Sequence, residues 1–247
     1  MEKYDTKPFE KNMENIGIFL NEKQITQFLQ YYELLIEWNS FMNLTAITDF
    51  DEVINKHFMD SLLLIKAYDL NQKKKDGSNL SIIDVGTGAG FPGIPLKIAF
   101  PELNITLLDS LGKRIKFLNE VVERLNLHGV KLIHGRAEDY AKPGLLREKF
   151  DLCVSRAVAN LSTLAEYCLP FVKKEGSFIS YKSEKLSEEM EASKKAIQLF
   201  GGKIEEKIEY TIPSTDIYRN LLVIKKIKAT PAIYPRKAGL PGKEPIL

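Results

Sequence analysis

The chain has 247 residues, of which 44% are hydrophobic and 28% are charged, a composition typical of a globular protein with one domain and an extension or with two small domains. No apolar run is long enough to cross a bilayer, and the charged start MEKYDTKPFEK lacks the core of a signal peptide. The net charge of +2 does not by itself indicate a nucleic-acid partner. Cys153 and Cys168 lie in apolar surroundings, so we expect reduced core residues of a cytoplasmic protein, and the three histidines do not supply a zinc site.

Residues 1–70 predict a helical extension without strands, and residues 71–247 predict a sheet domain. Asn21 is placed to cap a helix over residues 22–38, whose apolar side chains recur at steps of three and four. A second amphipathic helix is expected over residues 51–68. The segment WNSFMNLTAIT between them is expected to be a loop packed around Trp38, although its aromatic side chains suit stacking on a base as well.

His57 and Asp60 are three residues apart on the second predicted helix, so they share one face. A local hydrogen-bonded pair or a capping interaction is the favoured interpretation, and a catalytic dyad is the sharper one. In either case the two side chains are candidates for the wall of a pocket.

The segment SIIDVGTGAGFPG, residues 81–93, is the one around which the rest of the chain is organised. A buried strand is expected to end at Val85 and to be followed by a glycine turn and a helix whose first turn contains prolines. The spacing of Gly86, Gly88 and Gly90 differs from the dinucleotide pattern G-x-G-x-x-G. With Asp84 before it, this spacing favours S-adenosylmethionine, whose amino group and sulfonium suit a carboxylate; an ordinary glycine-rich turn is the alternative.

A second strand, NITLLD over residues 104–109, ends in an acidic residue 23 positions after Gly86. Acidic residues at about this spacing hydrogen-bond ribose hydroxyls in nucleotide-binding folds. Asp109 is therefore a predicted cofactor contact, and capping the following helix is its alternative role.

From residue 80 onward, strands and helices alternate, which predicts a doubly wound, mostly parallel α/β sheet of seven strands. Further strands are expected at residues 130–134, 150–155, 177–181, 203–212 and 220–227, and helices at 92–100, 110–126, 160–171 and 183–200. No helix separates the last two strands, so they are expected to close the sheet edge as an antiparallel hairpin. This is the Rossmann-like arrangement of class I S-adenosylmethionine-dependent methyltransferases.

Ligands of such sheets bind beyond the carboxyl ends of the strands. The third strand is followed there by Gly135, Arg136, Ala137, Glu138 and Asp139, which are candidates to read the adenine edge, unless the acids serve only as helix N-terminal charges. The fourth strand ends at Ser155 and Arg156, and the fifth at Lys182, which is a candidate RNA contact.

Two kinds of methyl transfer lack their usual residues. Methylation of an exocyclic amine commonly uses an Asp or Asn followed by Pro-Pro and an aromatic residue to orient the amine, but the fourth strand here leads into SRAV. Methylation of a pyrimidine carbon needs a cysteine nucleophile, and neither cysteine is placed as one. Guanine N7 is already nucleophilic, so positioning alone suffices. Arg156 is the predicted positioning residue, because it can hold guanine O6 but cannot also donate to N7 without blocking attack; its alternative is an ion pair with Glu138 or Asp139.

Taken together, the segments WNSFMNLTAI, KHFMDSL, IDVGTGAGFPGIPL, LLDS with KRIKFL, GRAED, SRAV and YPRKAGLPGKEPI resemble the ribosomal small-subunit methyltransferase G family, also called glucose-inhibited division protein B. The resemblance covers nearly the whole chain. It implies transfer of methyl from S-adenosylmethionine to N7 of a guanine in 16S ribosomal RNA, as naked RNA or as part of a small-subunit particle, with no metal and no membrane. It also implies cofactor contacts at Gly86, Phe91, Ala137, Glu138 and Arg156.

The last 27 residues contain six Lys or Arg and one Glu. From charge alone, a solubilising tail and a phosphate-binding tail are about equally expected. The resemblance places YPRK near the mouth of the pocket, which makes Arg236 and Lys237 candidate RNA contacts. Two alternatives to the methyltransferase stay open, a nicotinamide-dependent oxidoreductase and a noncatalytic RNA-binding or regulatory protein with the same fold.

Overall fold

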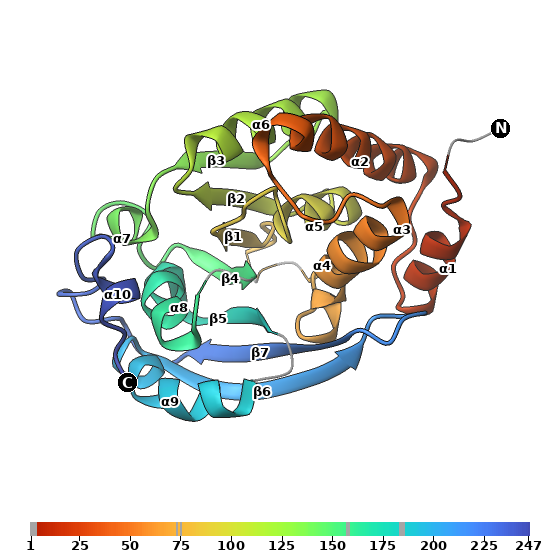
Figure 1. Cartoon of the computed structure of the whole chain (residues 1–247). Helices are drawn as coiled ribbons and strands as arrows, with labels where there is room; N and C mark the ends of the chain where they lie inside the picture. The colour runs from red at the N-terminus through yellow and green to blue at the C-terminus, as the bar shows by residue number, and fades with distance from the viewer. Residues whose placement is uncertain (1–3, 73, 75, 157–158, 183–185) are drawn as a thin grey trace.

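A computed structural model describes residues 4–72, 74, 76–156, 159–182 and 186–247 (Figure 1). Its centre is a seven-stranded sheet with the order β3-β2-β1-β4-β5-β7-β6. The strands are β1 (Ser81–Val85), β2 (Asn104–Asp109), β3 (Val130–His134), β4 (Phe150–Arg156), β5 (Val172–Lys182), β6 (Gly202–Thr211) and β7 (Tyr218–Lys226). The first five run parallel, and β7 lies antiparallel between β5 and β6. The predicted doubly wound sheet and its closing hairpin are confirmed.

Successive residues of β1 enter two different cores, because side chains alternate between the faces of a strand. Ile82 belongs to the core under the N-terminal helices, α5 and α6, and Ile83 belongs to the core under α7, α8 and α9. These helices are α5 (Gly93–Ala99), α6 (Gly112–Arg124), α7 (Ala137–Tyr140), α8 (Leu161–Cys168) and α9 (Leu186–Leu199), and a 3₁₀ turn, η3 (Leu169–Phe171), follows α8. Chain order reverses at β1, so the carboxyl ends of β1, β2 and β4 mark the expected site.

The N-terminal region is helical, as expected, and it shares its core with one face of the sheet. It contains α1 (Lys7–Asn15), α2 (Glu22–Met42), α3 (Phe50–Val53), the π-helical turn η1 (Ile54–Met59), α4 (Asp60–Leu62) and the 3₁₀ turn η2 (Leu63–Lys66). Asn21 caps α2 in a capping box with Gln24, as its sequence position predicts. Buried amides of Gln24 and Gln27 then donate to Ile98 O at the end of α5 and Leu125 O after α6.

Several features differ from the sequence expectation. Helix α2 continues to Met42, so the first part of the expected WNSFMNLTAIT loop, from Trp38 to Met42, is helical. The short helix α1 was not predicted, because it has only nine residues and buries only two apolar side chains, Phe9 and Met13. The predicted helix over residues 51–68 is a mixed helix with a π turn, a form that is often found at functional sites. The strand predicted at residues 177–181 extends from Val172 to Lys182. The predicted start of the helix at residue 183 lies outside the described residues, as do residues 157–158 of the SRAV segment.

Candidate active site

Two hollows that share Gly86, Asp109 and Ser110 open at the carboxyl ends of the parallel strands. The first, here called the Arg156 hollow, has a volume of about 410 Å³. It is bounded by the loop after α2, by the π turn and by residues 86–92 between β1 and α5, here called the glycine loop. The second, the Glu138 hollow, has a volume of about 340 Å³ and lies against the ends of β2 and β3, α8 and the C-terminal tail. Together they have the size of a site for a small organic ligand.

The glycine loop reaches from β1 across the end of β2. Gly86 and Gly88 have φ values of 71° and 63°, which favour glycine over other residues. The amide of Gly86 donates to Leu108 O at 2.8 Å, and the amide of Gly88 donates to Asp109 Oδ2 at 2.9 Å. The loop is therefore fastened to β2, and both glycines line the Arg156 hollow.

Asp84 lies beneath this loop and has no exposed surface. Its Oδ2 accepts from Thr87 Oγ1 at 2.7 Å and from the amide of Gly93 at 3.0 Å, while Oδ1 has no hydrogen-bond partner. Burial raises the pKa of Asp84 to about 6, although these donors oppose the shift. The sequence predicts a direct cofactor contact here; in the structure Asp84 lines neither hollow, and it shapes the loop from below.

Asp109 lies at the end of β2, between the glycine loop and the start of α6. The N-cap residue of α6 is Leu111, so Asp109 is not the cap residue that its alternative role requires. Its Oδ1 accepts from the amide of Leu111 ahead of α6, and its Oδ2 accepts from Gly88 and from Arg114 Nη1 at 3.1 Å. The carboxylate lines both hollows. Arg114 was missed as a site residue, since a basic residue in the first turn of an ordinary helix gives no local sign that it faces a pocket.

Arg156 is held on the wall of its hollow by residues of the π turn. Nη1 donates to Asp60 Oδ2 at 3.0 Å, and the guanidinium lies over the ring of Phe91, 5.1 Å from its centroid. The ion-pair partner is Asp60 instead of the expected Glu138 or Asp139, because the start of α4, directly after the π turn, brings a residue 96 positions away in the sequence to the end of β4. Glu138 and Asp139 contact Gly239 and Lys142 instead.

His57 and Asp60 both contact Arg156 of β4, so their contacts reach beyond the local pair or cap that the sequence favours. His57 stacks on Phe91 with ring centroids 4.5 Å apart, its Nε2 lies 2.9 Å from Thr45 Oγ1, and its Nδ1 lies 3.4 Å from Arg156 Nη2. Burial, reinforced by the charge of Arg156, lowers the pKa of His57 to about 4. The imidazole that lines this hollow is therefore neutral near pH 7.

The buried carboxylate of Asp60 has further partners on the hairpin at the far edge of the sheet. Tyr210 donates to Oδ1 at 3.0 Å, and Arg219 Nε lies 3.7 Å from the same oxygen. Tyr31 of α2 reinforces the glycine loop by donating to Ala89 O at 2.5 Å. Sequence patterns gave no sign of these contacts, because each joins segments far apart in the chain.

The C-terminal tail folds back onto the Glu138 hollow, where Figure 1 shows α10 (Leu240–Lys243) beside α8. Ala137, Glu138 and Gly242 line this hollow, and Glu138 Oε1 accepts from the amide of Gly239 at 2.7 Å. Arg236 is bound by Glu166 of α8, a carboxylate that is 1% exposed and that also accepts from the Arg236 amide. The tail is therefore part of the site wall.

The predicted RNA contacts differ in their surroundings. Lys182 donates to Ala159 O and to Glu189 Oε1 at 2.8 Å, and 13% of its side chain is exposed. Arg236 is neutralised by Glu166. Lys237 is exposed. Among these three side chains, Lys237 has the surroundings of a phosphate contact.

The comparisons with known proteins agree with this geometry. A family model described as rRNA small subunit methyltransferase G matches residues 24–216. The chain belongs to this family. The Ribosomal RNA small subunit methyltransferase G of Lachnoclostridium phytofermentans is 56% identical over 243 residues, which cover 98% of each chain. The protein of the same name from Acetivibrio thermocellus is 54% identical over 230 residues, 93% of this chain and 92% of that one.

Among solved structures, M. jannaschii TYW2 in complex with AdoMet has a TM-score of 0.52 and 16% identity, covering 68% of this chain and 77% of that one. At this identity the likeness shows the shared fold. Membership in the methyltransferase G family therefore rests on the family model, whose matched range spans the two hollows up to α8, and on the curated relatives.

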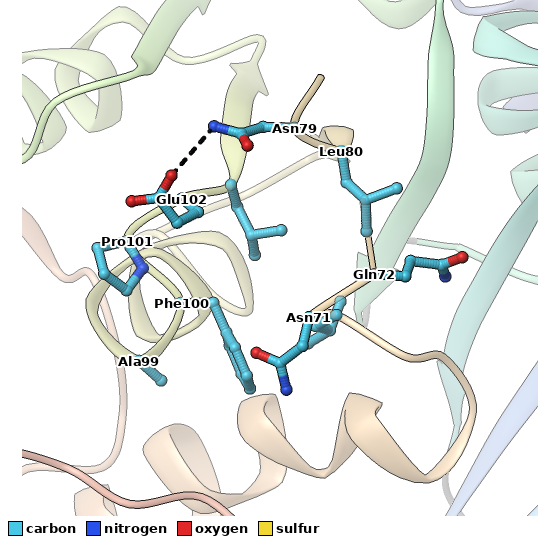
Figure 2. A pocket seen from close by; sticks show the side chains of 10 residues that line it. Asn71, Gln72, Asn79, Leu80, Ala99, Phe100, Pro101 and Glu102 are labelled. Carbon is cyan, nitrogen blue, oxygen red and sulfur yellow. Dashed lines mark hydrogen bonds between the residues drawn. The ribbon is translucent and has the colours of Figure 1, made fainter. Parts of the chain in front are cut away.

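A third hollow of this family member lies at the opposite end of the sheet, before β1 and after α5 (Figure 2). Its volume is about 120 Å³, and Figure 2 shows Asn79 and Glu102, joined by a hydrogen bond, together with Phe100 and Asn71 around it. Ligands of doubly wound sheets bind at the other ends of the strands, so this hollow is not assigned to the methyltransferase site.

Within the described part of the chain, no helix has the length and apolar character needed to span a membrane, and no group of His, Cys, Asp and Glu is arranged to hold a metal ion. Cys153 and Cys168 are buried, and burial raises the pKa of the Cys153 thiol. Neither cysteine lines the Arg156 or the Glu138 hollow.

Proposed function

We propose that this chain transfers the methyl group of S-adenosylmethionine to N7 of a guanine in 16S ribosomal RNA. Family membership makes it an S-adenosylmethionine-dependent methyltransferase of small-subunit ribosomal RNA. The finer proposal concerns the acceptor atom, and the Arg156 hollow supports it. This hollow presents a fixed cation, and among the described residues that line it there is no thiol and one carboxylate, Asp109, which we assign to the cofactor.

The two connected hollows suit the cofactor. Gly86 and Gly88 allow the ligand to approach the backbone, and Asp109 and Glu138 offer carboxylate oxygens to ribose hydroxyls and to the adenine amine. Ala137 is a candidate for a backbone contact. When bound, the cofactor supplies a methyl group that its sulfonium makes electrophilic.

Phe91 and Arg156 line the Arg156 hollow, and we propose that the acceptor guanine binds beside them. Guanine N7 carries an in-plane lone pair and no proton, so the chain need not supply a base. A neutral His57 with a pKa of about 4 fits this requirement, since it adds neither charge nor strong basicity. Arg156 donates to guanine O6 and leaves N7 open, and the remaining task is alignment of the acceptor with the methyl carbon.

The other two readings lack this support. A nicotinamide-dependent enzyme is expected to place G-x-G-x-x-G directly after the strand, whereas here β1 is followed by G-x-G-x-G and the dinucleotide spacing recurs only further on, at residues 88–93. Membership in the methyltransferase G family decides against this alternative. A noncatalytic RNA-binding protein has no need for a buried Asp60 that holds Arg156 at the hollow. We propose that the substrate is free 16S ribosomal RNA or a small-subunit particle, and that the reaction takes place in the cytoplasm. Lys237 is proposed as a phosphate contact beside the Glu138 hollow.

Incorporation of labelled methyl groups tests the acceptor atom. Purified protein is incubated with labelled S-adenosylmethionine and either 16S transcripts or small-subunit particles assembled from unmethylated RNA. Ordinary RNA is expected to gain N7-methylguanosine, identified by mass spectrometry of its nucleosides. RNA in which 7-deazaguanosine replaces guanosine is expected to accept no methyl group, although O6 and the exocyclic amine remain; methylation of this RNA would contradict the N7 assignment.

A further inference from the structure

An exposed patch at the end of α2 and the start of α6 borders the Arg156 hollow. We call it the α2–α6 rim and define it by Phe41, Leu111, Lys113 and Lys116. Phe41 is 66% exposed and Leu111 is 42% exposed, whereas most large apolar side chains of this protein are buried. The rim is continuous with the site, because Leu44 follows Phe41 closely in the chain, Ser110 precedes Leu111, and both Leu44 and Ser110 line the hollow.

The rim is held in place by contacts between the two helices, which lie side by side in Figure 1. Phe41 packs against Trp38 with ring centroids 5.5 Å apart, and Trp38 packs against Phe117 of α6 at 5.7 Å. Lys113 Nζ donates to Met42 O, the last residue of α2, at 3.0 Å. The exposed ring of Phe41 is therefore supported from behind.

The charge of the rim is positive. The first two turns of α6 contain Lys113, Arg114 and Lys116, and the first acid along this helix is Glu120. Arg114 turns inward to Asp109, while Lys113 and Lys116 are exposed. On the other side of the site, by contrast, Lys182 and Arg236 are neutralised by glutamates.

We infer that the α2–α6 rim binds single-stranded RNA next to the target guanine, with a base stacked on Phe41 and phosphates beside Lys113 and Lys116. This inference rests on the proposed function, which supplies the RNA. An exposed aromatic ring flanked by lysines is the arrangement that proteins use for unpaired nucleotides, since each base offers a face for stacking and each phosphate a negative charge. An unpaired strand is also the form in which a guanine can leave its neighbours and enter the hollow.

The stacking contact is tested with Phe41→Ala, and Phe41→Trp serves as the conservative variant. Phe19→Ala is the matched control, because Phe19 is an equally accessible phenylalanine, 78% exposed, between α1 and α2. The readouts are the KM for 16S RNA in methyl transfer and the anisotropy of a fluorescein-labelled single-stranded RNA oligonucleotide. Phe41→Ala is expected to weaken RNA binding by roughly 5- to 100-fold. Phe41→Trp and Phe19→Ala are expected to keep it, and the Kd for S-adenosylmethionine is expected to stay unchanged in all three.

The charge contact is tested with a Lys113→Ala, Lys116→Ala double variant, and with Lys116→Glu alone, which leaves the Lys113 bond to α2 intact. The control removes two exposed lysines far from the rim, Lys203→Ala on the edge strand β6 and Lys195→Ala on α9, which packs against β6. Log affinity falls as log salt rises, and the rim double variant is expected to make this fall shallower, with a slope smaller in magnitude by about 1 to 2, because two phosphate contacts are lost. The control is expected to keep the slope.

The possible outcomes separate this inference from the proposed function. If the unaltered protein methylates RNA and the rim variants match the controls, the inference is wrong and the proposed function stands. If the unaltered protein methylates no RNA, the proposed function fails, while the oligonucleotide assay still reports on the rim. If the rim variants bind free RNA normally and lose activity only on particles, the rim contacts a ribosomal protein and the inference is overturned.

Discussion

The Arg156 hollow and the Glu138 hollow are each bordered by an arginine paired with a buried carboxylate, and the two pairs have different roles. Asp60 and Arg156 are 3.0 Å apart, Glu166 and Arg236 are 2.7 Å apart, and the two acidic side chains are 3% and 1% exposed. Arg156 lines its hollow, so its pair fixes a positive charge in the site. Arg236 also offers its backbone amide to Glu166, so its pair fastens a segment of chain. The role of such a pair therefore depends on what the cation faces.

The comparison also shows why counting charges is a weak guide to RNA contacts. The tail has most of the local positive charge that the sequence suggests for RNA, yet Arg236 is committed to Glu166. The first turns of α6 stand out less in the sequence, and they present two exposed lysines beside the hollow.

The largest difference between the two ion pairs is expected when Asp60 is replaced. Asp60→Asn is expected to reduce the free energy of unfolding by about 3 kcal/mol or more, because Arg156 loses its buried counter-charge. It is also expected to lower kcat about 100-fold, since a displaced Arg156 no longer aligns the acceptor. Urea unfolding and steady-state kinetics measure the two effects. Asp139→Asn removes an exposed ion pair with Lys142 and is expected to cost less than about 0.5 kcal/mol; equal stability of the two variants would refute the role given to Asp60.

The glycine loop lies between the two ion pairs, and Gly90→Ala and Gly88→Ala form a matched pair of substitutions in it. A Cβ on Gly90, whose φ is 101°, lies 2.7 Å from Ile94 Cγ1 and 2.8 Å from both Leu118 Cδ2 and Tyr31 Oη. Gly90→Ala is therefore expected to destabilise the protein by roughly 2 to 4 kcal/mol and to abolish cofactor binding. Gly88→Ala meets no atom within 4 Å and is expected to cost only about 1 to 2 kcal/mol, through its φ of 63°. Thermal unfolding and calorimetric titration measure both, and a reversed order would contradict the packing described here.

The Arg156 side is expected to depend on pH through His57. The pKa of His57 falls from 6.5 to about 4 on folding, so the unfolded chain binds more protons between these values and stability falls as the pH drops from 6.5 toward 4. His57→Gln is expected to remove about 3 kcal/mol of this dependence. Asp84, with its pKa raised to about 6, acts in the opposite direction between pH 4 and 6, so the difference between variant and parent is the quantity to measure. Identical pH profiles in chemical denaturation would show that His57 is not held neutral.

The smallest effect is expected on the tail side. Glu166→Gln is expected to cost about 1 to 2 kcal/mol, because the hydrogen bonds to Arg236 partly survive and Arg236 is partly exposed. Since Gly242 of the tail lines the Glu138 hollow, the Kd for S-adenosylmethionine is expected to rise about threefold to tenfold while kcat is kept. Isothermal titration and kinetics on the same preparation check this, and a fall in kcat with unchanged cofactor affinity would make the two ion pairs equivalent in function.

Local sequence patterns carried much of the fold and part of the site. The strands from β1 to β4, the N-cap of α2 at Asn21, the glycine loop and the position of Asp109 were predicted, because apolar periodicity, caps and glycine turns depend on residues a few positions apart. They placed Gly86, Gly88, Ala137 and Glu138 at the strand ends where the hollows open, and the family resemblance added Phe91. Only the tertiary structure decided the partners of the charges: Asp60 for Arg156, Glu166 for Arg236, and Thr87 and Gly93 for Asp84. A side-chain ion pair between distant segments leaves no periodic trace in a sequence, since it depends on how the π turn, the tail and the sheet pack against one another.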